Sequence, residues 1–424
     1  MPTWRRTLYV IWFTQFVALA GFSFVFPFLP LYIQSFGVTD IDAVALWTGI
    51  ATAASPLSMA FMAPIWGALS DRVGRKLMIM RATGGTAIAL ILMGFAQAPW
   101  QITVLRLFQG IFSGVIAASS TLVASIVPED RRGAALGSLQ MSWFLGTTTG
   151  PLLGGLLGDA LGFRASFWIA GVVLILATLT VLLLVHEEVA PRDNKTSPRG
   201  GYSQALLALR AAGSALVIVL AARTVYRVGS AIFSPALALL VQSLLPDSSR
   251  VALITGLVAS AGALGGALGS PIIGGWGDRF GHRRVLILAG LAAGASLAPQ
   301  ALTPNTAFLA IFQLLSGFAI GGVLSASIAL MASHAPEDRL GTIFGLDASA
   351  VALANALGPL LGAGALAWLG VRSPLALAGA LMFAGSLVVI FFVPADERAG
   401  VTSRLRRWPL AWRRGGMPRP RHRR

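Results

Sequence analysis

An internal repeat constrains the fold of this chain more than any other feature, because the two halves of the sequence carry the same motifs about 208 residues apart. Three motifs recur in the same order: GALSDRVGRK at 67–76 and GGWGDRFGHRR at 274–284, PEDRRGAALG at 128–137 and PEDRLGTIFG at 336–345, and GPLLGG at 150–155 and GPLLGA at 358–363. The first long apolar segments of the halves also match, with Gln34 at the position of Gln242. Two homologous apolar halves predict two similar lobes, a site at their interface and movement of one lobe against the other.

The composition indicates that both halves lie in a membrane. Apolar residues make up 56% of the chain and charged residues 11%, and the mean hydropathy is +0.77, whereas a soluble domain is on average about 25% charged. A helix that spans a bilayer needs about 20 apolar residues. Twelve such segments can be drawn, at about 8–33, 46–69, 77–96, 100–126, 134–157, 164–185, 214–241, 251–273, 285–301, 306–331, 342–366 and 373–393. We therefore expect an all-α polytopic membrane protein with twelve transmembrane helices in two pseudo-symmetric six-helix lobes.

The segments between the predicted helices divide the chain into four parts. These are an N-terminal lobe (1–185), a cytoplasmic linker (186–213), a C-terminal lobe (214–393) and a basic tail (394–424). The end of the linker, at 202–211, is either a short interfacial helix or unstructured. The tail combines many arginines with tryptophans, which suits anionic lipids at the inner face of a membrane. Binding of nucleic acid by the tail is a weaker interpretation.

The positions of Lys and Arg predict how the chain crosses the membrane. Most of the 32 basic residues fall on the side that holds both termini, whereas the opposite side holds only Arg164, Arg250 and Arg372. Because positively charged loops stay in the cytoplasm, we expect a multi-pass protein of the cytoplasmic (inner) membrane with both termini in the cytoplasm. The first apolar stretch is too long for a removed signal peptide and lacks a small-residue cleavage site, so we interpret it as an anchor. The net charge of +16 then reflects topology and the tail, not a nucleic-acid partner.

The residue patterns that enzymes commonly use are missing from the sequence. The chain has no cysteine, which excludes disulfides and cysteine-ligated metals. It has no Gly-x4-Gly-Lys-Ser/Thr loop, so ATP hydrolysis is not predicted as a driving force. The histidines are too scattered for a metal site: they are His186, His282, His334 and His422. We predict a protein that is not an enzyme and that has no metal and no cofactor.

Two charged hairpins, one in each half, carry a Gly–Asp–Arg pattern that suits a conformational latch. Glycine permits the tight turn between two helices, and an aspartate can bind the N-terminus of a neighbouring helix. A simpler interpretation is that basic hairpins only fix the topology. The residues concerned are Gly67, Asp71, Arg72, Gly74 and Arg75 in the first hairpin, and Gly274, Asp278, Arg279 and Gly281 in the second, where His282 replaces Arg75.

A further motif, LRLFQGIFSG at 105–114, places Arg106 inside the fourth predicted span. A charge in the membrane is costly unless it faces a cavity or a partner. We therefore expect Arg106 to point inwards, with snorkelling to the nearer interface as the alternative.

The fifth predicted span carries a glycine motif. Gly146, Gly150 and Gly154 recur every fourth residue and form a stripe without side chains, which allows close helix contact. Pro151 permits a bend. Gly137 lies nine residues before the stripe and faces nearly the opposite way. Generic packing of small residues in a membrane bundle is the alternative explanation.

With these motifs, the chain resembles the major facilitator superfamily over nearly its whole length, and within it the 12-span drug:proton antiporters of bacterial multidrug resistance. The resemblance implies that the two Gly–Asp–Arg hairpins form a cytoplasmic gate and that Arg106 takes part in proton coupling. It also implies that the glycine motif, from Gly137 to Gly154, belongs to an exporter that runs as an antiporter. A monomer is the family expectation.

The chain departs from this family in the charge of its cavity. Many of these antiporters carry an acidic residue in the first span, where this chain has Gln15 as its most polar cavity candidate. Of the 16 acidic residues only Asp347 falls clearly within a span, whereas Arg223 and Arg227 share one face of the seventh span. These arginines either bracket an anion or line a hydrated crevice and bind backbone carbonyls. We expect a neutral to positive cavity, and a neutral, zwitterionic or anionic substrate rather than a strong cation.

These observations predict a proton-driven exporter of drugs or other amphiphilic small molecules that works by alternating access. Asp347 is the best candidate for the proton carrier, with Asp71 and Asp278 as alternatives. The candidate cavity and coupling residues are polar or aromatic, although helix packing explains each of them as well: Gln15, Phe24, Arg106, Gln109, Tyr226, Arg223, Arg227, Gln313 and Asp347. One alternative function is a dedicated exporter of one metabolite, such as a sugar, a siderophore or an amino acid derivative. Another is a membrane receptor that transports nothing.

Overall fold

The computed structural model describes residues 3–25, 27–128, 131–187, 202–245, 250–334 and 340–394, and these residues form helices and no strand. The first half contains α1 (Thr3–Ser23), α2 (Leu29–Gln34), α3 (Ile41–Val73), α4 (Arg75–Met93), α5 (Pro99–Phe112), α6 (Val115–Ile126), α7 (Arg132–Leu161) and α8 (Phe163–Leu184). The second half contains α9 (Tyr202–Ala231), α10 (Ser234–Leu244), α11 (Val251–Phe280), α12 (His282–Leu297), the short 3-10 helix η2 (Ala298–Leu302), α13 (Thr306–His334), α14 (Leu340–Leu369) and α15 (Ser373–Phe392). The predicted all-α class is confirmed.

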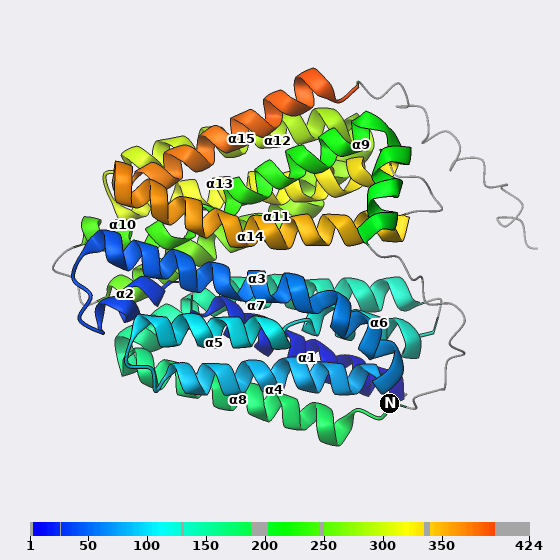
Figure 1. Ribbon diagram of the computed structural model, residues 1–424, viewed down its shortest axis with the longest axis horizontal. Helices are drawn as coiled ribbons and strands as arrows, with labels where there is room; N and C mark the ends of the chain where they lie inside the picture. The colour runs from blue at the N-terminus through cyan, green and yellow to red at the C-terminus, as the bar shows by residue number, and fades with distance from the viewer. Residues whose placement is uncertain are drawn as a thin grey trace, which may run out of the picture.

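The helices form two lobes that lie side by side, one built from α1 to α8 and the other from α9 to α15 (Figure 1). The N-terminus lies at one end of the molecule, and α2 and α10 lie at the opposite end. The predicted linker end at 202–213 is helical and belongs to α9. The rest of the predicted linker, at 188–201, and the tail at 395–424 lie outside the described residues.

The first helix of each lobe is interrupted at the same place in the repeat. After α1 the chain resumes as α2 with Pro30 in its first turn, and after α9 it resumes as α10 with Pro235 in its first turn. A proline is tolerated there because the backbone N–H groups in the first turn of a helix have no hydrogen-bond acceptor within the helix, so the N–H that proline lacks is not needed. Each pair therefore makes one long, interrupted segment.

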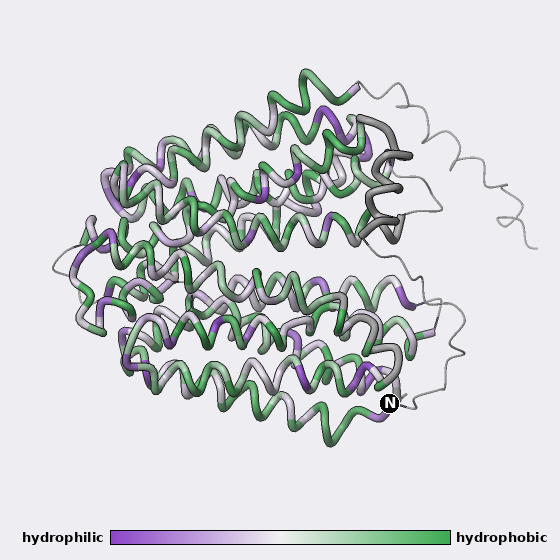
Figure 2. The backbone as a smooth tube through the Cα atoms, in the orientation of Figure 1, coloured by the Kyte–Doolittle hydropathy of each residue, from purple (hydrophilic) through white to green (hydrophobic). Residues whose placement is uncertain are grey.

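Ten helical segments among the described residues are long and apolar enough to cross a membrane. α1 and α7 are not among these ten, and together with the ten they make the twelve long segments that the sequence predicts. The buried positions of α7 are mainly glycine, which serves contact with other helices rather than with lipid. Figure 2 shows apolar residues along the helices and hydrophilic residues gathered mainly towards the ends of the lobes.

The glycine stripe of α7 brings that helix against α1. A Cβ atom added to Gly146 would lie 2.8 Å from the carbonyl oxygen of Phe16, and one added to Gly150 or Gly154 would overlap Ser23 or the backbone of Phe24. Each of these positions must therefore remain glycine if the two backbones are to keep this distance. Around Gly137, in contrast, no atom lies within 4 Å of such a Cβ.

Candidate functional site

A buried ion pair lies in the second lobe, where α9, α13 and α14 meet. Arg223 Nε donates to Asp347 Oδ1, and the two side chains are only 8% and 10% exposed. Arg223 Nη1 also donates to Ser327 Oγ at 2.7 Å and to Leu324 O at 3.4 Å. Such a pair persists away from water only because each charge has its counter-charge and further N–H groups have acceptors. The sequence identified both charged residues but did not predict that they pair.

Arg227 lies one turn further along α9 and adds a second positive charge beside this pair. It is within electrostatic reach of both Arg223 and Asp347. Its Nε is buried and has no hydrogen-bond partner among the described residues. Two guanidinium groups and one carboxylate leave a net positive charge in this part of the lobe.

The first lobe carries a neutral version of this site at the positions that the repeat makes equivalent. At an offset of 208, Gln15, Leu139 and Ser119 take the places of Arg223, Asp347 and Ser327. Gln15 Nε2 donates to Leu139 O at 2.9 Å, so the same two positions are in contact in both lobes. Gln15 Oε1 and Ser119 Oγ are buried and lack hydrogen-bond partners in the part of the chain that the structure describes.

Arg106 is wholly buried in the first lobe. Its Nε donates to Ala51 O at 3.3 Å and its Nη1 donates to Gln109 Oε1 at 2.8 Å, while its guanidinium carbon lies 5.4 Å from the centre of the Phe22 ring. These contacts come from α3, α5 and α1. A side chain that snorkels would end at the polar surface, so this geometry is that of an inward-pointing arginine.

The other predicted cavity residues make packing contacts within their own lobes. The ring of Phe24 packs edge-on against Phe28, at a centroid distance of 5.0 Å. The hydroxyl of Tyr226 shares a hydrogen bond of 3.0 Å with Ser386 Oγ. Gln313 is 4% exposed, and its Oε1 accepts a hydrogen bond from Ser316.

The two Gly–Asp–Arg hairpins turn at glycines in the left-handed region, Gly74 at φ 92° and Gly281 at φ 93°. In the first hairpin, the carboxylate of Glu187 accepts from the backbone N–H of Arg75 at 3.0 Å and so caps α4. In the second, the side chain of Arg283 donates to Val393 O and Ile390 O at 2.7 Å each. The first hairpin is thereby tied to the segment that follows α8, and the second to the end of α15.

The predicted gate residues are only partly described at the level of side chains. The surroundings of Gly67 and the side chains of Asp71 and Arg72 lie outside the described part of the structure. Asp278 lies 3.5 Å from Nε2 of His282, one turn further along the chain. The latch therefore remains a prediction.

The two lobes are joined by hydrogen bonds at the end of the molecule that holds α2 and α10 (Figure 1). Gln34 and Gln242, which are equivalent in the repeat, each donate to the side-chain oxygen of the other at 3.1 and 3.2 Å. Asp159 Oδ2 accepts from the backbone N–H of Leu253 at 2.7 Å and caps the start of α11 from the other lobe. Sequence analysis missed Asp159, because only the fold shows that its carboxylate meets the N-terminus of α11.

Close backbone contact extends this junction between the lobes. A Cβ atom on Gly49 of α3 would lie 2.9 Å from Pro359 O of α14, and one on Gly256 of α11 would overlap Pro151 O of α7. The two prolines are equivalent in the repeat. The lobes thus meet through two related pairs of helices, around an approximate two-fold axis.

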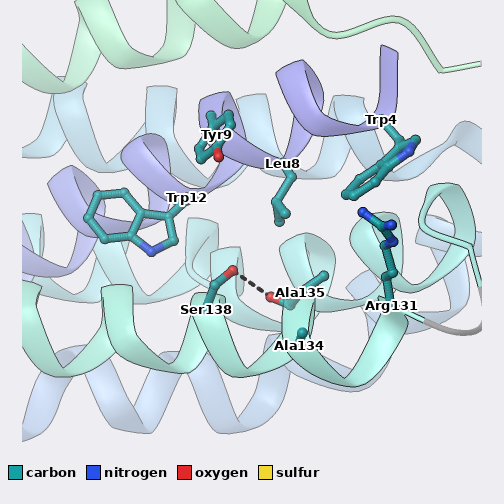
Figure 3. A pocket seen from close by; sticks show the side chains of 8 residues that line it. All are labelled: Trp4, Leu8, Tyr9, Trp12, Arg131, Ala134, Ala135 and Ser138. Carbon is teal, nitrogen blue, oxygen red and sulfur yellow. Dashed lines mark hydrogen bonds between the residues drawn. The ribbon is translucent and has the colours of Figure 1, made fainter. Parts of the chain in front are cut away.

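A cavity of about 470 Å³ opens between α1 and the beginning of α7 (Figure 3). It is lined by Trp4, Leu8, Tyr9, Trp12, Arg131, Ala134, Ala135 and Ser138. None of the buried charged residues described above lines it.

Two lobes of related helices, joined at one end and carrying buried charges in the bundle, define the class of secondary membrane transporters. The family model of the Major Facilitator Superfamily matches residues 11–225 and 219–415. The chain belongs to this superfamily.

Curated relatives and solved structures agree with this assignment. The chain is 35% identical over 382 residues to a protein of Proteus mirabilis named multidrug resistance protein MdtG, covering 90% of this chain and 94% of that one. It is 33% identical over 389 residues to the protein of the same name from a Rahnella species, covering 92% of each.

Among solved structures, the chain resembles the human organic anion transporter MFSD10 (TETRAN), with a TM-score of 0.66, 20% identity and coverage of 92% of this chain and 100% of that one. It also resembles the nucleoside transporter NupG, with a TM-score of 0.74, 13% identity and coverage of 90% and 99%. At these identities the likeness shows the fold. With ten apolar segments among its described residues and with these relatives, the protein is a multi-pass inner-membrane protein.

Proposed function

We propose that this protein is a proton-driven exporter of drugs or other amphiphilic molecules, with both termini in the cytoplasm. The name of its relatives supports the export of drugs. The hydrogen bonds and close contacts at the α2 and α10 end support a state that is closed towards the outside. Opening of this end, together with closure of the Gly–Asp–Arg end, would expose one site to each side in turn.

The buried pair of Arg223 and Asp347 is the observation that carries the proton-coupling part of the proposal. In its ionised form Asp347 holds α14 to α9. A proton on Asp347 would remove the counter-charge of a buried arginine, which costs about 3–5 kcal/mol. The protonated protein would therefore favour a conformation in which Arg223 reaches water or another anion. A proton and a substrate that favour different conformations can be exchanged for one another.

The charge of this site supports a substrate class. Arg227 adds a positive charge next to the pair, and its Nε lacks a hydrogen-bond partner among the described residues. An anionic or zwitterionic substrate could satisfy these guanidinium groups when Asp347 is protonated. Neutral amphiphiles fit the apolar surroundings, whereas strong cations would be repelled.

The remaining parts of the proposal follow from the position of the charges in the sequence. Basic hairpins and a basic tail fit the cytoplasmic side, where the tail would bind anionic lipids. The hairpins around Asp71 and Asp278 would close that side. We propose that the protein works as a monomer, without a metal, a cofactor or a nucleic-acid partner.

The test is proton release from pre-acidified inverted membrane vesicles that contain the full-length protein. Anionic, zwitterionic, neutral and cationic amphiphiles are added in turn, and we expect release with several unlike compounds but not with strong cations. Asp347→Asn should abolish the response. Asp42→Asn, an exposed acid at the start of α3, is the matched control and should leave the response intact.

Other outcomes would point to other functions. A response to one chemical class only would identify a dedicated exporter of one metabolite. No response from folded protein to any compound would contradict proton-driven export and favour a receptor. An intact response in Asp347→Asn would move the proton site to another acid.

A further inference from the structure

We propose that the cavity between α1 and α7 is a second binding site, for transported amphiphiles that combine an aromatic body with an anionic group. The proposal rests on the proposed function only in assigning the ligand to the transported molecules. The site would bind such a molecule at the end of the bundle that holds the N-terminus, before the molecule reaches Arg223 and Arg227.

The dimensions and walls of the cavity suit a small molecule. Its volume of about 470 Å³ falls within the range of about 300–1,000 Å³ that is usual for ligand sites. α1 contributes three aromatic rings, and α7 contributes small side chains opposite them. Figure 3 shows Trp4 and Arg131 together at one end of the cavity and Trp12 at the other. The result is an apolar slot with a guanidinium group at one end.

The repeat provides an internal comparison for the part of the lining whose equivalents in the second lobe are described. At an offset of 208, the second lobe has larger aliphatic residues opposite the equivalent helix: Ile343 replaces Ala135 and Leu346 replaces Ser138. Ile343 is buried in the core of that lobe, and Leu346 packs against the same core. The equivalents of Leu8 and Trp12 are Leu216 and Leu220, which belong to that core, as Leu8 and Trp12 pack against the core of the first lobe. On the α7 side, the cavity of the first lobe is therefore lined by two small residues, Ala135 and Ser138, whose equivalents in the second lobe are larger.

The lining determines the chemistry of the ligand. Flat aromatic walls favour a planar, apolar body through ring stacking. The guanidinium of Arg131 lines the same end as Trp4, and that of Arg5 lies 5.3 Å from the Trp4 ring. An anionic group is the chemistry that suits this end. The Arg223 and Arg227 region has the same sign of charge, so a molecule accepted by the slot would also suit that region.

The experiment measures binding of dansylated undecanoic acid to the full-length protein in phosphatidylcholine nanodiscs. Ser138→Leu installs the residue that fills the equivalent place in the second lobe, and we expect it to weaken binding about tenfold. Ala134→Leu enlarges an exposed position on the same wall and should act in the same direction. Ala295→Ile, at an exposed position of α12, is the control and should bind as the unaltered protein does. Thermal unfolding confirms that each variant is folded.

Two results would overturn the proposal. Unchanged probe affinity in both folded α7 variants would show that the slot is not the binding site. If phosphatidylglycerol in the nanodiscs displaces the probe from the unaltered protein but not from Ser138→Leu, the occupant is a lipid rather than a transported molecule.

Proton release from vesicles is measured separately, so that the two proposals can fail independently. If the protein releases protons and the Ser138→Leu and Ala134→Leu variants bind the probe with unchanged affinity, proton-driven export is supported and the proposed second binding site is rejected. If these variants weaken probe binding but no compound causes proton release from vesicles, the second binding site is supported and proton-driven export is rejected.

Discussion

The two lobes place the same contact at equivalent positions but make it from different chemistry. In the first lobe, Gln15 donates to the backbone of Leu139, whereas in the second lobe Arg223 pairs with Asp347. The neutral version needs no counter-charge, and it leaves one amide oxygen unsatisfied among the described residues. The charged version carries the carboxylate that we propose as the proton carrier. The difference teaches that the repeat supplies the scaffold, while one lobe alone carries this titratable pair.

Where backbones touch, in contrast, the lobes are alike. Gly154 lies against Phe24, just after the end of α1, and its equivalent Gly362 lies against Ile232, just after the end of α9. Contact of this kind depends on the absence of a side chain and not on charge. The repeat therefore preserves the packing between the first helix of each lobe and its fifth long segment, and leaves the buried polar positions free to differ.

The largest expected effect comes from replacing the charged pair of the second lobe, Arg223 and Asp347, by the neutral residue types of the first lobe. Asp347→Leu alone leaves a buried arginine without its counter-charge, which should lower the free energy of unfolding by about 3–5 kcal/mol. Adding Arg223→Gln to this variant removes the orphaned charge and should restore much of that stability. Both variants should lose proton release by at least about tenfold, because protons no longer have this carrier. Thermal unfolding and vesicle assays on the two variants check this prediction.

A double variant that remains folded and still releases protons would break the comparison. Its result would place the proton carrier outside the pair, with Asp71 and Asp278 as the next residues to replace.

The glycine contacts predict a smaller effect that is equal in the two lobes. Gly154→Ala and Gly362→Ala each force a methyl group into backbone atoms, and each should lower the free energy of unfolding by about 1–3 kcal/mol. The equivalent pair Gly137 and Gly345 has no atom within 4 Å of an added Cβ. Alanine there should be neutral or stabilising by about 0.4–1 kcal/mol, since it restricts the unfolded chain. Denaturation of the purified variants measures all four values, and a large loss at Gly137 would contradict the packing argument.

The smallest expected effect concerns the glutamine pair that joins the lobes. Gln34→Leu and Gln242→Leu each remove the same reciprocal hydrogen bonds, and each should favour the outward-open state by about 1 kcal/mol. The chain has no cysteine, so a single Ala252→Cys at the buried junction reports opening through its reaction with an impermeant maleimide. We expect labelling to increase about fivefold in either variant. Unequal effects of the two leucines would show that the pair is not symmetric in function.

Much of the fold could be predicted because its signals are local. Apolar length locates the helices, and Pro235 at the first turn of α10 marks a break that the chain makes at the same place in both halves. The period of Gly146, Gly150 and Gly154 predicts a close helix contact before the partner helix is known. The site was harder to predict, because residue type does not show whether an aromatic side chain faces a cavity or a neighbouring helix. The predicted cavity residues Phe24 and Tyr226 both contact other side chains of their own lobe.

The sequence by itself determined that the chain crosses the membrane many times, that it has two related halves, and that Arg106, Arg223 and Asp347 are charges in an apolar setting. Only the tertiary structure decided their partners. Arg223 and Asp347 are 124 residues apart, and Asp159 meets a backbone N–H 94 residues away in the other lobe. Composition and periodicity indicate which face of each helix can be buried. The pairing of side chains and the formation of a cavity depend on which helices are neighbours and on how far each is shifted along its axis relative to the other.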